Sequence, residues 1–195
     1  VWHYGADPER IRVVPCGVDL KRFRPAPQAE ARAKLGLPAD GRLLVCVGRM
    51  EPLKGMDTLI RALAALRAAG CPWSSKLQVL LIGGEVEAKV QSWNAEQRRL
   101  DALRRELGVT EAVRFLGAQP QELLPDYFAA ADVVVAPSHY ESFGMVALEA
   151  MASGAAVVAS NAGGMALTIE DGRSGLLVPP ADPAPLAAQI GRLLD

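Results

Sequence analysis

Short apolar runs alternate with longer amphipathic segments along most of the chain. The runs are rich in β-branched residues and hydrophobic throughout, which is typical of strands with both faces covered. They predict strands at 43–47, 77–82, 113–116, 133–136, 155–159 and 175–178. The segments between them predict helices over 57–69, 91–107, 121–131, 144–153 and 183–194. This succession indicates an α/β fold with a doubly wound, parallel, Rossmann-like sheet.

Two segments depart from this alternation. Residues 1–25 contain helix-breaking prolines and a brief strand around Val13, and they begin without an initiator Met. We expect them to form an interdomain connection and first strand in a piece of a longer protein, and residues 26–195 to form the Rossmann-like domain. Residues 85–107 carry many charges of both signs, which favours a solvated helix with ion pairs between successive turns. A partner surface is the alternative for this helix.

Composition limits the function. The 195 residues are half apolar, so the chain can bury the core of one ordinary domain. Its 21 basic and 22 acidic side chains nearly cancel, so no overall field attracts nucleic acid or anionic lipid. The three cysteines lack metal-type spacing, and the sequence shows no signal segment and no apolar run of transmembrane length. We therefore expect a cytoplasmic protein with no nucleic-acid partner and no transmembrane segment.

A single acid, Glu149, lies within an otherwise apolar stretch, Met145–Ala152. At helical spacing it shares a stripe with Met145, Leu148 and Ala152, so its carboxylate is expected to point toward the core. A buried carboxylate needs a partner, which a ligand hydroxyl, a backbone donor or a cation can provide. The alternative is a Glu at the rim of a core helix that reaches solvent.

Glycines and charged residues recur at the turns that follow the predicted strands. In doubly wound sheets, ligands bind at the carboxyl ends of the strands, where the chain turns into the helices. Glycine also ends strands and permits tight turns for purely structural reasons, which is the alternative at any one of them. The five turns are Gly48–Arg49 with Lys54–Gly55, Gly83–Gly84, Gly117, Pro137–Gly144 and Ser160–Gly164.

Arg49 and Lys54 flank the first of these turns, where two cations can neutralise a diphosphate. The alternative is a pair of solvated surface cations. Across the sheet, the helix that follows Gly144 begins with amides that have no partner within the helix, which suits an anion. Glu149, about a turn further on, would then accept hydrogen bonds from both hydroxyls of the adjoining ribose.

These residues resemble those of the retaining glycosyltransferases of family 4, the glycosyl transferases group 1. That family has the two-Rossmann GT-B architecture and includes sucrose, sucrose-phosphate and mycothiol-pathway glycosyltransferases. Nearly the whole chain takes part, through Val14–Asp19 with Phe23, Val47–Gly55, Arg114–Gly117, Ala131–Asp132, Pro137–Val146 with Glu149, Gly163–Gly164, Asp171–Gly172 and Gly175–Val178. Each match is weak alone, but the order and spacing make the resemblance specific. It implies the C-terminal, donor-binding domain.

The resemblance implies transfer of a sugar from a UDP-, GDP- or ADP-sugar with retention of anomeric configuration. Arg49 and Lys54 match the diphosphate-binding pair and Glu141 matches the acid against the donor sugar, so these three are the implied catalytic residues. Backbone around Arg114 and Phe115 would contact the base. The implied donor-binding residues are Gly48, Arg49, Lys54, Arg114, Phe115, Glu141, Phe143, Gly144, Met145, Val146 and Glu149. Because two cations and a helix end supply positive charge and no Asp-x-Asp element is present, we expect no essential metal and no cofactor.

The sequence departs from the family pattern at a few positions. Cys16 replaces a common Asn in a turn that tolerates either residue. Ala166 and Leu167 stand where many members have Pro-Glu, which leaves the identity of the sugar open. His139 is a tempting acid–base group, but a lone loop histidine is more often structural, and the family's functional histidine lies in the other domain. We therefore assign His139 no role.

Family members also carry an N-terminal Rossmann domain that binds the acceptor, and this sequence lacks it. We therefore predict a donor-binding fragment that binds nucleotide but transfers nothing alone. The acceptor stays open, and any peripheral attachment to a membrane would use the absent domain.

Other functions need a similar phosphate site. A sugar-nucleotide epimerase or hydrolase of the same architecture is one alternative, although the spacing of Arg49, Lys54 and the paired glutamates argues against it. An oxidoreductase with a dinucleotide cofactor fits less well, because no Gly-x-Gly-x-x-Gly follows the first strand of the domain. A non-catalytic nucleotide-sugar-binding module is the alternative outside the enzymes.

Overall fold

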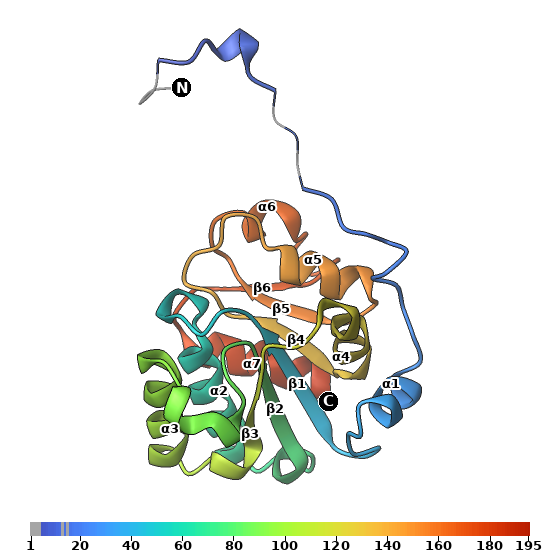
Figure 1. Ribbon diagram of the computed structural model, residues 1–195. Coiled ribbons are helices and arrows are strands. Elements are labelled where there is room, and N and C mark those ends of the chain that lie inside the picture. The colour runs from blue at the N-terminus through green and yellow to red at the C-terminus, as the bar shows by residue number, and fades with distance from the viewer. Residues whose placement is uncertain (1–4, 13, 15) are drawn as a thin grey trace.

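The computed structural model describes residues 5–12, 14 and 16–195, and Figure 1 shows how they are arranged. The strand expected around Val13 lies outside the described residues. One parallel sheet of six strands has the order β3-β2-β1-β4-β5-β6. The strands are β1 (Arg42–Val47), β2 (Leu77–Ile82), β3 (Val113–Gly117), β4 (Val133–Ala136), β5 (Val157–Ser160) and β6 (Leu176–Val178). The prediction of a parallel Rossmann-like sheet is confirmed.

Helices cover both faces of the sheet (Figure 1). One layer consists of α2 (Met56–Ala68), α3 (Ala95–Glu106) and α7 (Pro183–Leu194). The other consists of α1 (Gln28–Lys34), α4 (Leu124–Ala130), α5 (Met145–Ala152) and α6 (Met165–Thr168). None of the helices in the described residues is long and apolar enough to cross a membrane.

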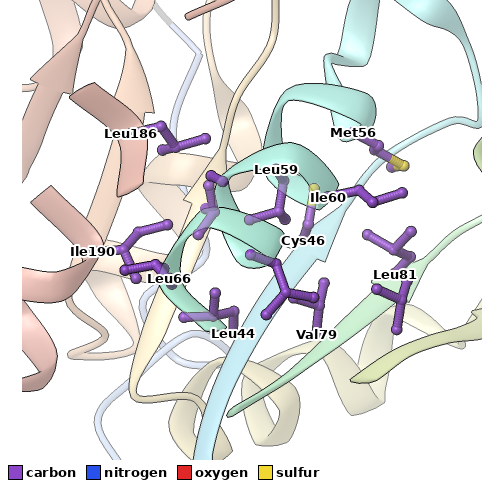
Figure 2. Close-up of a cluster of buried hydrophobic side chains, with 14 of the residues drawn as sticks. Leu44, Cys46, Met56, Leu59, Ile60, Leu66, Val79, Leu81, Leu186 and Ile190 are labelled. Atoms are coloured by element: carbon purple, nitrogen blue, oxygen red, sulfur yellow. The ribbon is translucent and has the colours of Figure 1, made fainter. Parts of the chain in front are cut away.

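Successive residues of β1 serve the two layers in turn. Leu44 and Cys46 belong to the core under α2 and α7, whereas Leu43 and Val45 belong to the core under α4 and α5. Figure 2 shows the first of these cores, where side chains of β1, β2, α2 and α7 gather. Because both faces of the inner strands are buried, these strands are hydrophobic along most of their length, whereas β3, at the edge of the sheet, carries the exposed Arg114.

The segment before α1 is anchored on the second layer. Phe23 is buried there, with its ring centroid 6.2 Å from that of Phe128 in α4. The preceding residue, Arg22, donates a hydrogen bond from its guanidinium to Oε1 of Gln121 at 2.9 Å. The packing of Phe23 therefore fixes Arg22 beside the start of α4.

Two helices and several boundaries differ from the sequence prediction. Helices α1 and α6 were not expected, because both are short and have too few large apolar residues to show a helical period. Helix α3 begins at Ala95 rather than residue 91, since Asn94 caps it by accepting a hydrogen bond from the Gln97 amide at 2.8 Å. Strand β5 begins at Val157 rather than residue 155, because the Ala155 amide is still bonded to the Ala150 carbonyl and so completes the end of α5.

The charged helix α3 is less solvated than its sequence predicts. The expected ion pairs between successive turns are present, for example between Arg99 and Glu96 and between Arg105 and Asp101. Arg104, however, is buried and its guanidinium lies 5.0 Å from the centroid of the Phe115 ring. An arginine can enter a core when its charge and donors are satisfied, and here Asp101 pairs with it.

Candidate functional site

The site expected at the strand ends lies between β1 and β4, in the middle of the sheet. From β1 the chain turns to α2 on one face, and from β4 it turns to α5 on the other face. The two loops therefore separate at this point, which is where α/β sheets of this order bind ligands. A small cavity of about 20 Å³ lies here, lined by residues that include Val47, Lys54, Ala136, Glu141 and Gly144. That volume holds about one water molecule.

The loops around this cavity pack on each other through glycines. Gly55 has a φ of 63°, and a Cβ at this position would lie only 2.0 Å from the Pro137 carbonyl oxygen. Gly163 has a φ of 54°, and a Cβ there would lie 2.0 Å from the Glu141 carbonyl oxygen. That same carbonyl accepts a hydrogen bond from the Gly164 amide at 2.7 Å. The loop from Pro137 to Gly144 is thus fixed from both sides, and with it the position of Glu141.

Lys54 and Glu141 form an ion pair at the mouth of the cavity. The distance from Lys54 Nζ to Glu141 Oε2 is 2.6 Å, and each side chain is 22% exposed. Burial opposes ionisation of Glu141 most strongly, but the bond from Lys54 and the backbone amides of Phe143 and Ser142 outweigh it, so the pKa of Glu141 lies below its usual value. The Glu141 carboxylate is therefore ionised at neutral pH, and the pair brings together two of the three expected catalytic residues.

Arg49, the third of them, points away from this pair. Its side chain is 75% exposed, and its guanidinium donates to Oε1 of Glu51 at 2.7 Å. Gly48, just before it, lies next to the aliphatic part of Lys54, whose carbons would be at the ordinary contact distance of 3.6 Å from a Cβ at that position. The turn thus places Arg49 and Lys54 on one loop but directs their side chains to different carboxylates.

Helix α5 begins at the opposite side of the cavity, after Gly144. Gly144 has a φ of 90° and provides no side-chain cap, and the first hydrogen bond within the helix runs from the Leu148 amide to the Gly144 carbonyl at 3.1 Å. The amides of Met145, Val146 and Ala147 therefore precede the first helical hydrogen bond. This is the arrangement in which a helix N-terminus can bind an anion.

Glu149 lies in α5 as a buried residue, 8% exposed. Among the described residues its carboxylate has no hydrogen bond and no ion pair, and burial raises its pKa while the charge of Arg22 opposes that rise. The residue is buried as expected, but its carboxylate oxygens keep contact with water, and the stripe was misplaced: Ala147 and Ala150 are the fully buried positions, whereas Leu148 and Ala152 are half-buried. Glu149 therefore retains unused acceptor capacity.

The residues expected to contact the nucleotide base lie farther away, on a different strand of the sheet. Phe115 is buried in the core, with its ring centroid 5.0 Å from that of Trp93, so only its backbone can contact a ligand. Arg114 is exposed. Neither residue lines the cavity beside Lys54, and they belong to β3, which β2 separates from β1.

His139, to which the sequence analysis assigns no role, holds two loops of the site together. The His139 amide donates to the Leu53 carbonyl at 2.9 Å, and its Nε2 lies 3.3 Å from Oγ1 of Thr58 in α2. His139 thus ties the loop after β4 to the loop after β1. Sequence reasoning missed this contact, and it also missed Arg22 and Glu51, since no spacing rule links either residue to its neighbours in the site.

A larger cavity lies at the other end of the sheet, where β1 and β2 begin. It measures about 290 Å³ and is lined by residues that include Arg32, Arg42 and Lys76. Their charges are already paired, with Asp132 for the two arginines and Asp40 for the lysine.

Within the described part of the chain, no group of three or more His, Cys, Asp or Glu residues could hold a metal ion.

The fold and the site together define a class of protein. A parallel sheet in the order β3-β2-β1-β4-β5-β6, with helices on both faces and a cation and a helix N-terminus at its reversal point, is a Rossmann-like domain. A family model described as "Glycosyl transferases group 1" matches residues 27–195. The chain belongs to this family and corresponds to its C-terminal domain, so the family predicted from the resemblance is confirmed.

Relatives and solved structures agree with this assignment. The chain is 46% identical over 192 residues to D-inositol 3-phosphate glycosyltransferase of Acidothermus cellulolyticus, covering 98% of this chain and 42% of the relative. Sucrose-phosphate synthase from Thermosynechococcus elongatus superimposes with a TM-score of 0.80 at 43% identity, covering 94% of this chain and 43% of that one. Anabaena HepE in complex with UDP and glucose gives a TM-score of 0.82 at 29% identity, covering 100% and 50%. The chain thus spans half or less of the length of these proteins.

Proposed function

We propose that this chain is the donor-binding half of a retaining glycosyltransferase and binds a nucleotide-diphospho-sugar. The observation that carries the proposal is the Lys54–Glu141 ion pair at the reversal point of the sheet, opposite the first amides of α5. A cation and free helix amides on two sides of one position suit a diphosphate. A carboxylate beside them suits the hydroxyls of the attached sugar.

Each expected residue has a role in this proposal. Lys54 and Arg49 bind the diphosphate, together with the amides from Phe143 to Val146. Glu149 accepts hydrogen bonds from the two hydroxyls of the ribose, which supply the partners that its buried carboxylate needs. Glu141 contacts the sugar. The base lies against the backbone around Phe115.

The proposed chemistry is electrostatic. As the bond between the sugar and the diphosphate breaks, negative charge grows on the departing oxygen, and preorganised cations stabilise that charge. Lys54 is preorganised because Glu141 and the packed loops hold its ammonium group in place. Two cations and a helix N-terminus supply this charge, so the proposal includes no metal ion.

The relatives support the donor class and leave the acceptor open. HepE was solved with UDP and glucose, and the inositol 3-phosphate enzyme is named for its acceptor. We propose UDP-sugars as the first donors to test. The acceptor would bind to the part of the enzyme that corresponds to the remainder of the relatives' length.

Ligand-dependent thermal stability tests the proposal. The melting temperature is measured with UDP, GDP and ADP at matched concentrations, with and without magnesium, and with uridine as the control without phosphate. A ligand at 100 times its Kd stabilises the native state by about 2.7 kcal/mol, which corresponds to a Tm rise of roughly 5–10 °C for a chain of this size. We expect a rise for one diphosphate, independent of magnesium and much larger than that for the nucleoside. No rise with any of the three diphosphates contradicts the proposal.

A second assay separates the proposal from its alternatives. The isolated chain is incubated with the preferred nucleotide-sugar, and free nucleotide and altered sugar are measured by chromatography. We expect neither product, because the chain binds the donor without its acceptor half. Release of nucleotide and sugar would favour a hydrolase, and an altered sugar still bound to nucleotide would favour an epimerase. A full-length protein that binds donor but never transfers would favour the non-catalytic binding module.

A further inference from the structure

Both cations of the proposed diphosphate site are already paired with carboxylates of the chain itself. Arg49 donates to Glu51 at 2.7 Å, and Lys54 donates to Glu141 at 2.6 Å. A carboxylate and a phosphate present the same kind of oxygen to a guanidinium or an ammonium group, so they compete for the same donors. A diphosphate therefore gains each cation only by replacing a glutamate.

We propose that Glu51 and Glu141 act as internal substitutes for the diphosphate, so that donor binding is an exchange of carboxylates for phosphates, and that Glu51 is a positioning residue which lowers donor affinity. This inference rests on the proposed function. It assigns a role to Glu51, which lies two residues after Arg49 on the same turn.

The backbone makes the Arg49–Glu51 contact local and readily restored. The Glu51 amide donates to the Arg49 carbonyl at 2.8 Å, which closes the turn and brings the two side chains close together. The pair is largely exposed to water, so breaking it costs little. Arg49 can therefore turn from Glu51 to a phosphate without any change in the backbone.

The Lys54–Glu141 pair is more protected and lines the cavity. Its two side chains are mostly buried, and the cavity beside them has only about 20 Å³ of space. A phosphate or a hexose is much larger than one water molecule, so these side chains must separate to admit it. Glu141 is held by the Gly163–Gly164 loop, whereas Lys54 has a flexible stem, and we therefore infer that Lys54 is the side that moves.

Separation of this pair has a consequence for specificity. When a diphosphate binds Lys54, the partly buried Glu141 carboxylate keeps the backbone amides of Ser142 and Phe143 but loses its cation, and the donor that Lys54 supplied has to be replaced. The hydroxyls of a donor sugar provide a replacement, whereas a nucleoside diphosphate without a sugar does not. The exchange therefore favours the intact nucleotide-sugar over the product diphosphate.

Titration calorimetry with inorganic pyrophosphate tests the exchange. The parent chain is compared with Glu51→Gln and Glu141→Gln, which remove one charge each and keep the shape. Asp40→Asn is the matched control, because Asp40 pairs with Lys76 at 2.6 Å at the opposite end of the sheet. We expect pyrophosphate to bind about two- to fivefold more tightly to Glu51→Gln and about five- to tenfold more tightly to Glu141→Gln, with no change in the control.

A double-mutant cycle separates the exchange from simple repulsion by Glu51. In an Arg49→Ala background the exchange predicts that Glu51→Gln no longer changes pyrophosphate affinity, whereas repulsion predicts the same gain as before. The sugar-dependent step is tested with UDP and UDP-glucose. We expect Glu141→Gln to raise the affinity for UDP more than the affinity for UDP-glucose, so that the preference for the sugar-bearing ligand falls.

The outcomes distinguish this inference from the proposed function. Pyrophosphate affinity that is unchanged in both glutamine variants overturns the inference, as does a Glu51→Gln gain that persists in the Arg49→Ala background. If the variants bind pyrophosphate more tightly but UDP, GDP and ADP bind no better than pyrophosphate, the exchange holds and the nucleotide site is wrong. If neither the parent nor any variant binds pyrophosphate, both are wrong.

Discussion

The carboxylate of Glu149 gives the sharpest prediction, because stability and binding should move in opposite directions when it is changed. The substitution is Glu149→Gln, which keeps the shape and removes the charge. In the chain alone the residue is buried, and its carboxylate keeps some contact with water but has no hydrogen bond or ion pair among the described residues, so burial raises its pKa. The charged form is therefore less stable in the folded chain than in water, and the neutral amide should stabilise the fold.

The size and the pH dependence follow from the same argument. A buried polar group without a partner costs about 1–3 kcal/mol, but water still reaches this carboxylate and the charge of Arg22 offsets part of the cost, so we expect a gain of about 0.5 kcal/mol. For a chain of this length that corresponds to a Tm rise of about 1–2 °C. Because the pKa is higher in the folded state, the folded chain holds the proton over a wider range, and the cost of Glu149 appears as pH rises through its folded pKa. The gain is therefore full at neutral pH and is lost as pH falls below the ordinary value of 4.5.

Thermal unfolding of the parent and the variant at pH 7.5 and pH 4.5 measures this gain, with the exposed Glu111→Gln as the control for loss of one negative charge. Calorimetric titration with UDP measures the binding, which we expect to weaken by roughly 1 kcal/mol as one strong acceptor for the ribose is lost. An equal Tm for parent and Glu149→Gln at pH 7.5, or a gain of the same size at pH 4.5, refutes the burial argument. Unchanged UDP affinity together with a higher Tm refutes only the ribose assignment.

Three further predictions concern other parts of the chain. Arg49→Ala should weaken UDP binding by roughly 1.5–3 kcal/mol and leave uridine binding almost unaffected. An equal loss for both ligands would contradict a role of Arg49 in binding phosphate. Arg32→Met should cost about 3–5 kcal/mol in urea unfolding, because Arg32 is buried and its loss leaves Asp132 without its closest cation; a cost below about 1 kcal/mol contradicts this. Gly163→Ala should cost about 1–3 kcal/mol and also tighten pyrophosphate binding, since its Cβ would displace the Glu141 loop and so free Lys54; a change in stability alone would show that the loop does not position Glu141.

The sheet was predictable because its strands carry their own signal. Burial of both faces makes most strands continuous apolar runs, and all five predicted helices recur, α7 with the predicted ends and the other four with shifted ends. Helices α1 and α6, which the sequence analysis did not predict, lack such a signal. Helix α1 is held by a polar anchor rather than an apolar stripe: the buried Arg32 donates to the Ala130 carbonyl and to Asp132 from α1. Such an anchor depends on residues about a hundred positions away, which a local pattern does not show.

In the site, too, only the features with a local signal could be predicted from the sequence. Glu149 and the start of α5 could be placed from sequence, because their burial and free amides follow from one helix and its preceding glycine. The ion pair of Lys54 with Glu141 joins residues 87 positions apart and depends on the sheet order, which brings β1 next to β4. The sequence supplied both residue types, and the topology supplied their contact.

The contact made by the Arg49 side chain could not be predicted from motif spacing. Spacing places Arg49 and Lys54 on one turn, and from that alone both side chains are expected over the strand ends. In the structure Arg49 turns to Glu51, because an exposed arginine next to a glutamate on a closed turn finds its nearest anion there. Under the proposed function, the motif therefore indicates which groups bind the diphosphate, and the neighbouring carboxylates determine how tightly they do so. A residue between the matched positions, here Glu51, can then alter the affinity of a site without being one of its ligands.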